Sequence, residues 1–223
     1  MRRILPLIAA TFAGVLAGCV PATAEPSGGM VLASTVGAHP GGVLTSEYKG
    51  KLVPQKGDEL AMFALGCFWG SEYTFRRVPG VVATAVGFSG GTTTNPSYEQ
   101  VCNGDTRHAE TVLVEYDPKK ITYRQLLEVF WASHDPTTLN QQGPDFGDQY
   151  RSAIFAFTPG QKALAEETRN AEQKITRGKI VTQIQMAGPF YPAELYHQQY
   201  VVKTGHNSCP PPRRAIKGVK LGG

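Results

Sequence analysis

The chain has 223 residues, of which 41% are hydrophobic, and a formal net charge of +4 at pH 7. This composition excludes a disordered or collagen-like chain and leaves room for one or two globular domains. Two of the positive charges, Arg2 and Arg3, lie in a leader that we expect to be removed, which leaves 4 − 2 = +2. So small an excess gives no electrostatic footprint for a nucleic acid.

The first 18 residues have the pattern of an export signal. A positively charged start precedes an apolar run, residues 4–18, which is too short for a comfortable membrane span. The run ends in Leu16-Ala17-Gly18-Cys19, which resembles the lipobox of bacterial lipoproteins. We expect residues 1–18 to be removed and Cys19 to carry lipid that anchors the protein at the periplasmic side of a bacterial membrane. A plain secretory signal cut after Ala24 is the alternative, and it also predicts export.

Residues 19–57 are rich in Gly, Pro, Ser, Thr and Ala and show no sustained hydrophobic period. We interpret them as a flexible tether. Residues 58–223 are predicted to form a single domain, which is dense in regular elements up to about residue 208.

Alternating or continuous apolar runs predict the strands of this domain, and 3.6-residue periods predict its helices. The mixed order favours an α+β two-layer sandwich over a doubly wound sheet, with a mixed sheet, a ferredoxin-like core and a long C-terminal coil. The strands are predicted at residues 58–65, 81–88, 109–116, 152–157 and 179–185, and the helices at 67–77, 95–101, 123–130, 159–175 and 194–202.

Cys67 stands where the first strand gives way to the first helix. A helix N-terminus carries a partial positive charge that stabilises a thiolate, which is a strong nucleophile. Phe68 and Trp69 follow directly and suggest an apolar cage for a small group. From these residues alone, a buried thiol in an aromatic core is an equally good interpretation.

The chain has four cysteines, and three remain once Cys19 is assigned to lipid. An odd number argues against a static disulfide framework and favours one reactive pair and one inert thiol. No spacing typical of a metal site occurs, and no glycine-rich phosphate loop is evident. The basic residues of the tail, Arg213, Arg214, Lys217 and Lys220, are expected to be solvated.

The run Gly66-Cys67-Phe68-Trp69-Gly70 resembles the signature of A-type peptide methionine sulfoxide reductases. The resemblance extends in family order from about Leu60 to Cys209. Further matching segments lie at residues 89–91, 95–98, 101–106, 108–110, 130–131, 134–136, 149–154, 190–191 and 197–200.

This resemblance implies that the Cys67 thiolate attacks the sulfur of methionine sulfoxide, free or protein-bound, and that Glu110 protonates the departing oxygen. The predicted strand 109–116 places Glu110 on one face with Val112 and Val114, and burial there would raise its pKa. The family acts on the S epimer of the sulfoxide.

The resemblance also implies a substrate site. Tyr98 and Tyr150 would donate hydrogen bonds to the sulfoxide oxygen, and Asp145 would help to orient solvent and substrate. Phe68 and Trp69 would enclose the methyl group on sulfur.

Cys209 matches the family's resolving cysteine, which condenses with the sulfenic acid left on Cys67. The resulting disulfide needs an external dithiol, usually a thioredoxin-like protein, and the enzyme binds no cofactor. Many relatives carry a further distal cysteine, but residues 210–223 contain none, so we predict that the Cys67–Cys209 disulfide meets the reductant directly. An exported enzyme of this kind would repair oxidised exported proteins.

Three positions modify this prediction. The family signature has Gly before His108, where this chain has Arg107. Cys102 matches a non-catalytic family cysteine and is expected to be a buried, inert thiol. His108 and His197 are expected to be hydrogen-bonding scaffold residues.

Two other functions stay open. A Cys–His hydrolase would pair Cys67 with His108 or His197 and would need no reductant. A non-enzymatic envelope lipoprotein would bind peptides through its aromatic residues.

Overall fold

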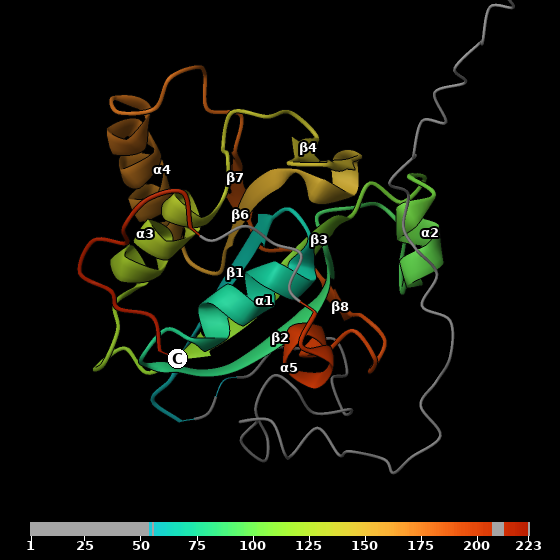
Figure 1. Ribbon diagram of the computed structural model, residues 1–223, viewed down its shortest axis with the longest axis horizontal. Coiled ribbons are helices and arrows are strands. Elements are labelled where there is room, and N and C mark those ends of the chain that lie inside the picture. Colours follow the sequence, from blue (N-terminus) through green and yellow to red (C-terminus); the bar gives the residue numbers. More distant parts are fainter. Residues whose placement is uncertain (1–53, 55, 207–211, 223) are drawn as a thin grey trace, which may run out of the picture.

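The computed structural model describes residues 54, 56–206 and 212–222 (Figure 1). The export signal, Cys19 and Cys209 lie outside the described residues, so the predictions for them stay predictions. No helix in the described ranges is both long enough and apolar enough to cross a membrane.

A six-stranded mixed sheet forms the centre of the domain, with the strand order β7-β6-β1-β3-β2-β8. Its strands are β1 (Glu59–Leu65), β2 (Val81–Ser89), β3 (Ala109–Tyr116), β6 (Ser152–Ala156), β7 (Gln183–Met186) and β8 (Phe190–Pro192). The inner order β6-β1-β3-β2 is entirely antiparallel, whereas β7 joins β6 in parallel. This is a ferredoxin-like core, and it confirms the predicted α+β class.

Three helices pack on one face of this sheet: α1 (Phe68–Arg76), α3 (Tyr123–Ser133) and α4 (Pro159–Gln173) (Figure 1). Local sequence fixes where they begin. Thr122 accepts a hydrogen bond from the Gln125 backbone, and the Gln125 side chain accepts one in return, so a capping box starts α3. Thr158 caps α4 ahead of a proline at the first helical position. The two remaining helices, α2 (Tyr98–Cys102) and α5 (Tyr200–Thr204), are short, and α5 packs against α1.

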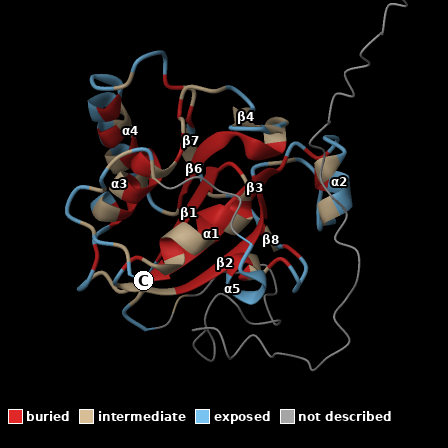
Figure 2. Ribbon diagram, viewed as in Figure 1, coloured by how far each residue is buried: buried red, intermediate tan, exposed pale blue. Residues whose placement is uncertain are grey.

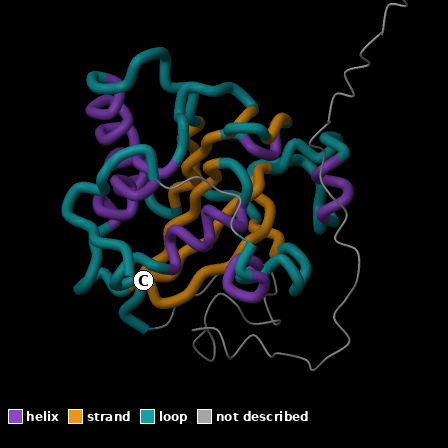
Figure 3. Tube along the Cα trace, in the orientation of Figure 1, coloured by secondary structure: helices purple, strands orange, loops and turns teal. Residues whose placement is uncertain are grey.

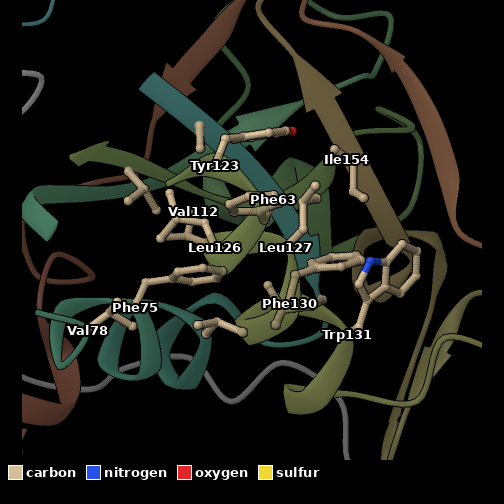
Figure 4. Close-up of a cluster of buried hydrophobic side chains, with 14 of the residues drawn as sticks. Phe63, Phe75, Val78, Val112, Tyr123, Leu126, Leu127, Phe130, Trp131 and Ile154 are labelled. Carbon is tan, nitrogen blue, oxygen red and sulfur yellow. The ribbon is translucent and has the colours of Figure 1, made fainter. Parts of the chain in front are cut away.

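The main hydrophobic core lies between the sheet and the three helices (Figure 4). Phe63 of β1 is at its centre, stacked on Phe75 at 5.0 Å between ring centroids and packed against Phe130 at 5.5 Å. A second cluster, which includes Met62 and Leu113, occupies the opposite face of the sheet. Both faces of β3 are therefore buried along its whole length (Figure 2), although its alternating sequence is also typical of a strand with one wet face.

Three predicted elements differ from the structure. The predicted helix at 95–101 begins only at Tyr98, because Ser97 is its N-cap residue. Residues 194–199 are not helical, because Gln199 adopts a left-handed conformation (φ +57°), and α5 begins only at Tyr200. The predicted strand at 179–185 is paired only from Gln183, because Ile180 and Val181 donate their backbone hydrogen bonds elsewhere, to Gln173 and to the carbonyl of Pro136.

The sequence patterns also missed three short elements. They are the hairpin of β4 (Gln141–Gln142) and β5 (Asp145–Phe146), the 3-10 helix at Asp148–Tyr150, and the edge strand β8. All three are too short to show a period.

The C-terminal tail, residues 212–222, is a coil that packs along the helical layer (Figures 1 and 3). Its apolar residues Ile216, Val219 and Leu221 rest against the main core. The tail's basic residues Arg213, Lys217 and Lys220 are exposed, as predicted, whereas Arg214 is half-buried. Arg214 pairs with Glu172 at 2.5 Å, and Arg213 donates to the carbonyl of His134 at 3.0 Å, because both carbonyl and carboxylate acceptors line this path.

Candidate active site

The turn that carries Cys67 requires a glycine before it. Gly66 has φ +99°, a conformation that L side chains rarely adopt, and a Cβ there would lie 2.7 Å from Cγ of Gln142. β1 ends one residue earlier and α1 begins at Phe68, so Cys67 is the N-cap residue of α1. Its half-buried side chain carries a thiol rather than a disulfide. The predicted position at a strand-to-helix junction is confirmed.

Glu110 of β3 is buried, with 2% of its surface exposed. The backbone N–H of Phe68, the first of helix α1, donates to Oε2 of Glu110 at 2.9 Å. An unsatisfied N–H at a helix N-terminus is a natural partner for a carboxyl group. This hydrogen bond, across 42 residues of sequence, fixes the carboxyl group beside Cys67.

Tyr98 and Tyr150 lie close to the same two groups. Burial, followed by the negative charge of Glu110, raises the pKa of each phenol well above its ordinary value, and the charge of Cys67 contributes to both shifts. Both hydroxyl groups therefore stay protonated at neutral pH. They are able to donate hydrogen bonds to an oxygen atom near Cys67.

Aromatic rings form the wall next to Cys67. Phe68 is 1% exposed, and its ring centroid lies 6.2 Å from that of Tyr98 and 5.2 Å from that of His197. Trp69 stacks on Tyr200 at 3.9 Å. We call these five residues the aromatic cage. In the sequence-based prediction, Phe68 and Trp69 formed such a cage and Tyr98 belonged to the substrate site, but Tyr200 was not included and His197 had no place in the cage.

His197 holds the indole of Trp69 in place. Nε1 of Trp69 donates to Nδ1 of His197 at 2.9 Å. Because an indole nitrogen only donates, Nδ1 must be the acceptor, and the neutral ring carries its hydrogen on Nε2. Burial lowers the pKa of His197 to about 4, which keeps the ring neutral at pH 7. The predicted scaffold role of His197 is confirmed by this hydrogen bond.

A cavity of about 210 Å³ lies beside Cys67. Asp145 of β5 contributes to it, and burial raises the pKa of this carboxyl. The charge of Asp145 also acts on Tyr150, which places the two residues close together. The cavity is lined by Leu65, Cys67, Gly70, Ser71, Thr74, Ser133, His134, Gln142, Gly143, Pro144, Asp145 and Arg213.

A second buried acid, Glu72, joins α1 to β2 and to the segment that carries His197. Its carboxyl accepts from Thr84 Oγ1 at 2.9 Å and from the backbone N–H of Gln199 at 2.6 Å. Burial raises the pKa of Glu72 to about 7. Glu72 thereby ties α1 to the left-handed residue that ends the segment carrying His197. In the sequence, only the position of Glu72 five residues after Cys67 could have indicated this role.

Cys102 differs from its prediction. It is half-buried at the C-terminal end of α2 and is engaged in a disulfide, so it is not an inert, buried thiol. Its partner lies outside the described residues. Cys102 is four residues from Tyr98 on the same short helix, so this disulfide lies about one helical turn from a residue of the cage.

Arg107 has φ +56° and an exposed side chain. A left-handed backbone explains why glycine suits this position. The next residue, His108, accepts from the backbone of Gly91 and contacts the carbonyl of Thr93 at 2.8 Å, as expected of a scaffold residue. Among residues 54, 56–206 and 212–222, no group of three His, Cys, Asp or Glu side chains could hold a metal ion.

Comparisons with known proteins agree with this geometry. A family model described as peptide methionine sulfoxide reductase matches residues 59–217. Peptide methionine sulfoxide reductase A2 of Arabidopsis thaliana is 54% identical over 74% of this chain and 76% of its own length. Peptide methionine sulfoxide reductase MsrA of Methanoculleus marisnigri is 56% identical over 71% of this chain and 98% of its own.

Two solved structures share the fold. Methionine sulfoxide reductase A of Corynebacterium diphtheriae has a TM-score of 0.64 at 40% identity and covers 70% of this chain and 79% of its own. Reduced Mxr1 of Saccharomyces cerevisiae has a TM-score of 0.67 at 35% identity, over 79% of this chain and 98% of its own.

Proposed function

Since this chain belongs to the peptide methionine sulfoxide reductase family, whose members reduce methionine sulfoxide, we propose that Cys67 is its nucleophile and Glu110 its general acid. The observation that carries this proposal is the hydrogen bond from the Phe68 backbone to Glu110. It holds a buried carboxyl group next to the residue whose thiol must attack. The substrate is the S epimer of methionine sulfoxide, in proteins or as the free amino acid.

In the first step the Cys67 thiolate attacks the sulfur of the sulfoxide. The sulfoxide oxygen takes a proton from Glu110, and the hydroxyl group then moves from the substrate sulfur to Sγ of Cys67 as the bond between the two sulfur atoms breaks. The products are methionine and a sulfenic acid on Cys67, so one oxygen atom moves from substrate to enzyme and the substrate sulfur is reduced. Without a proton donor the departing oxide would be a poor leaving group, and a carboxylic acid shielded from water is suited to supply the proton.

Two hydroxyl groups and an apolar wall orient the substrate. Tyr98 and Tyr150 donate hydrogen bonds to the sulfoxide oxygen, and their high pKa values keep both protonated as the oxygen becomes more negative. Phe68 and Trp69 enclose the methyl group, where burial of carbon favours it by about 25 cal/mol per Å². Asp145 orients solvent and the rest of the substrate from the edge of the cavity.

A second thiol then condenses with the sulfenic acid, with loss of water, to give a disulfide. We assign this role to Cys209 and the regeneration of both thiols to a thioredoxin-like dithiol. A structure of Mxr1 from Saccharomyces cerevisiae in complex with Trx2, 26% identical to this chain at a TM-score of 0.50, is consistent with such a partner. The electrons come from thiols, so no bound cofactor is needed.

The disulfide at Cys102 makes it a competitor for the resolving role. To separate the two cysteines, the protein is reduced, freed of reductant and given methionine-S-sulfoxide, and its disulfides are mapped by mass spectrometry. We expect one methionine per protein and a Cys67–Cys209 bond in the wild type. Cys102→Ser should keep that bond, and Cys209→Ser should lose it. A disulfide between Cys67 and Cys102 would reassign the resolving thiol, and absence of methionine would contradict the function itself.

The hydrolase alternative has little support in the site. His197 accepts from Trp69, and the ring nitrogens of His108 face Gly91 and Thr93. A base that activates Cys67 needs a ring nitrogen directed at the thiol.

We also propose export, with lipid on Cys19 and repair of oxidised exported proteins as the role. The support is the sequence of residues 1–19 alone. Growth of expressing cells with a labelled fatty acid tests it. Label should enter the wild type but not Cys19→Ala, and label-free wild-type protein in the soluble fraction would contradict the lipid anchor.

A further inference from the structure

The cavity beside Cys67 is distinct from the aromatic cage. It contains Cys67, but within the described part of the chain no residue of the cage lines it, nor does Glu110. A substrate whose sulfur meets Cys67 and whose methyl group enters the cage must direct the rest of its chain elsewhere. The cavity opens from the same cysteine, so residues that flank a methionine sulfoxide would pass into it.

Arg213 supplies the positive charge of this cavity. Its backbone N–H donates to the carbonyl of Ala132 at 2.7 Å, and its Nη1 donates to the carbonyl of His134 at 3.0 Å. These two bonds fix a tail residue against the end of α3. The guanidinium has five N–H donors, and only one makes a hydrogen bond to a described residue. Its side chain is 47% exposed, so the remaining donors are accessible from the cavity.

Arg213 forms an ion pair with Asp135, but this ion pair is long. Asp135 lies 3.7 Å from Nη1, and its Oδ1 already accepts from both the backbone and the hydroxyl of Thr137. Asp145 belongs to the β4–β5 hairpin, a different wall of the cavity from the tail. His134, which also lines the cavity, has a pKa lowered to about 4 by burial, and so it is neutral at pH 7.

We propose that Arg213 and the cavity beside Cys67 form a subsite for an acidic residue next to the methionine sulfoxide of a peptide substrate. This inference rests on the proposed function and specifies its substrate class. A guanidinium binds a carboxylate in a planar, two-bond geometry, which suits an Asp or Glu side chain. The arginine comes from the tail, so the preference for acidic flanks is a property of the tail and not of the catalytic residues.

The test compares two peptides that differ only beside the methionine-S-sulfoxide, one with Glu and one with Lys at that position. The measured quantity is the ratio of their kcat/KM values in the full chain with a thiol reductant. A half-exposed ion pair predicts a ratio of about two to five in favour of the Glu peptide. Arg213→Glu should invert the ratio. Lys217→Glu is the matched control, because it makes the same charge change on an exposed tail residue that does not line the cavity.

Each outcome decides the proposal. Inversion by Arg213→Glu with an unchanged ratio in Lys217→Glu supports it, and weakening of the wild-type ratio by salt supports it further. Equal kcat/KM values for the two wild-type peptides, or a ratio that survives Arg213→Glu, would overturn the subsite while leaving the reductase intact. Reduction of neither peptide would instead overturn the proposed function and the subsite with it.

Discussion

The two ends of helix α1 are built for different purposes. At its N-terminal end, Phe68 and Trp69 contact rings and a carboxyl group that surround Cys67. At its C-terminal end, Phe75 stacks on Phe63 in the main core at 5.0 Å. Glu72, between them, bonds to both the sheet and the segment before α5. One short helix therefore joins the catalytic residues to the core, and substitutions along it should separate activity from stability.

The largest effect on stability is expected from the core end. Phe75→Ala removes a fully buried ring and should lower the free energy of unfolding by about 3–5 kcal/mol through lost burial and a residual cavity. Urea denaturation of the mature protein measures it. Cys67→Ser, at the other end of the helix, is the control and should change the unfolding free energy by less than about 0.5 kcal/mol. Equal losses of unfolding free energy in the two variants would show that the two ends of α1 contribute equally to stability.

The middle of the helix should make stability depend on pH. The pKa of Glu72 is raised by burial to about 7 in the folded state, from 4.5 when unfolded. The unfolded state therefore ionises first, and the contribution of Glu72 to stability is greatest below pH 4.5 and falls as the pH rises to 7. The full shift of the Glu72 pKa corresponds to about 3 kcal/mol of unfolding free energy.

Glu72→Gln removes this titration, and its hydrogen bond to Thr84 is retained by the amide. The difference in unfolding free energy between wild type and variant should therefore change in favour of the variant between pH 4.5 and 7. Denaturant titrations at several pH values measure this difference. A difference that is constant over this range would show that Glu72 stays ionised in the folded protein.

At the catalytic end of α1, a smaller free-energy effect is expected, and it falls on activity. Trp69→Phe keeps an apolar ring but removes the hydrogen bond to His197, and the ring should no longer be held in one orientation. We expect kcat/KM for a methionine-S-sulfoxide peptide to fall about tenfold, which corresponds to one lost hydrogen bond of about 1.4 kcal/mol. Tyr200→Phe keeps the stacking and serves as the matched variant. If the two variants lose the same activity, the indole hydrogen bond has no role in orientation.

The smallest expected effect is a gain in stability. Arg107 adopts φ +56° three residues before Glu110, at a position where the family has glycine. Arg107→Gly should relieve this backbone strain, but glycine loses more chain entropy on folding than arginine does. The net result should be a gain of about 0.5–1 kcal/mol in the free energy of unfolding. Thermal unfolding of both proteins provides the check. A lower midpoint temperature in the glycine variant would mean that the Arg107 side chain contributes more than its backbone costs.

Local sequence was sufficient for the parts of the site that depend on neighbours in the chain. Gly66 and Cys67 stand at a junction that a continuous apolar run and a glycine predict, and Glu110 falls within a regular, fully buried strand. The catalytic end of α1 was predictable for this reason, and the family resemblance then supplied the roles of its residues.

Contacts between distant segments could not be predicted in the same way. Trp69 and His197 are 128 residues apart, and the bond between them depends on a left-handed residue, Gln199, that no propensity indicates. The hairpin that carries Asp145 has strands of two residues and shows no period. The basic tail was expected to be solvated, and nothing in its sequence indicated that Arg213, although exposed, donates hydrogen bonds to carbonyl groups at the end of α3.

In the proposed reaction, the sulfoxide oxygen passes to Cys67 with help from Glu110. The most direct measurement uses Cys102→Ser/Cys209→Ser, in which neither competing thiol can condense with a sulfenic acid. After one equivalent of methionine-S-sulfoxide, mass spectrometry should find one added oxygen on the peptide containing Cys67 and one methionine released. The same variant with Glu110→Gln should form both products at least about a hundredfold more slowly at neutral pH. Methionine released without oxygen on Cys67 would contradict the role of Cys67, and an unchanged rate in the Glu110→Gln protein would contradict the role of Glu110.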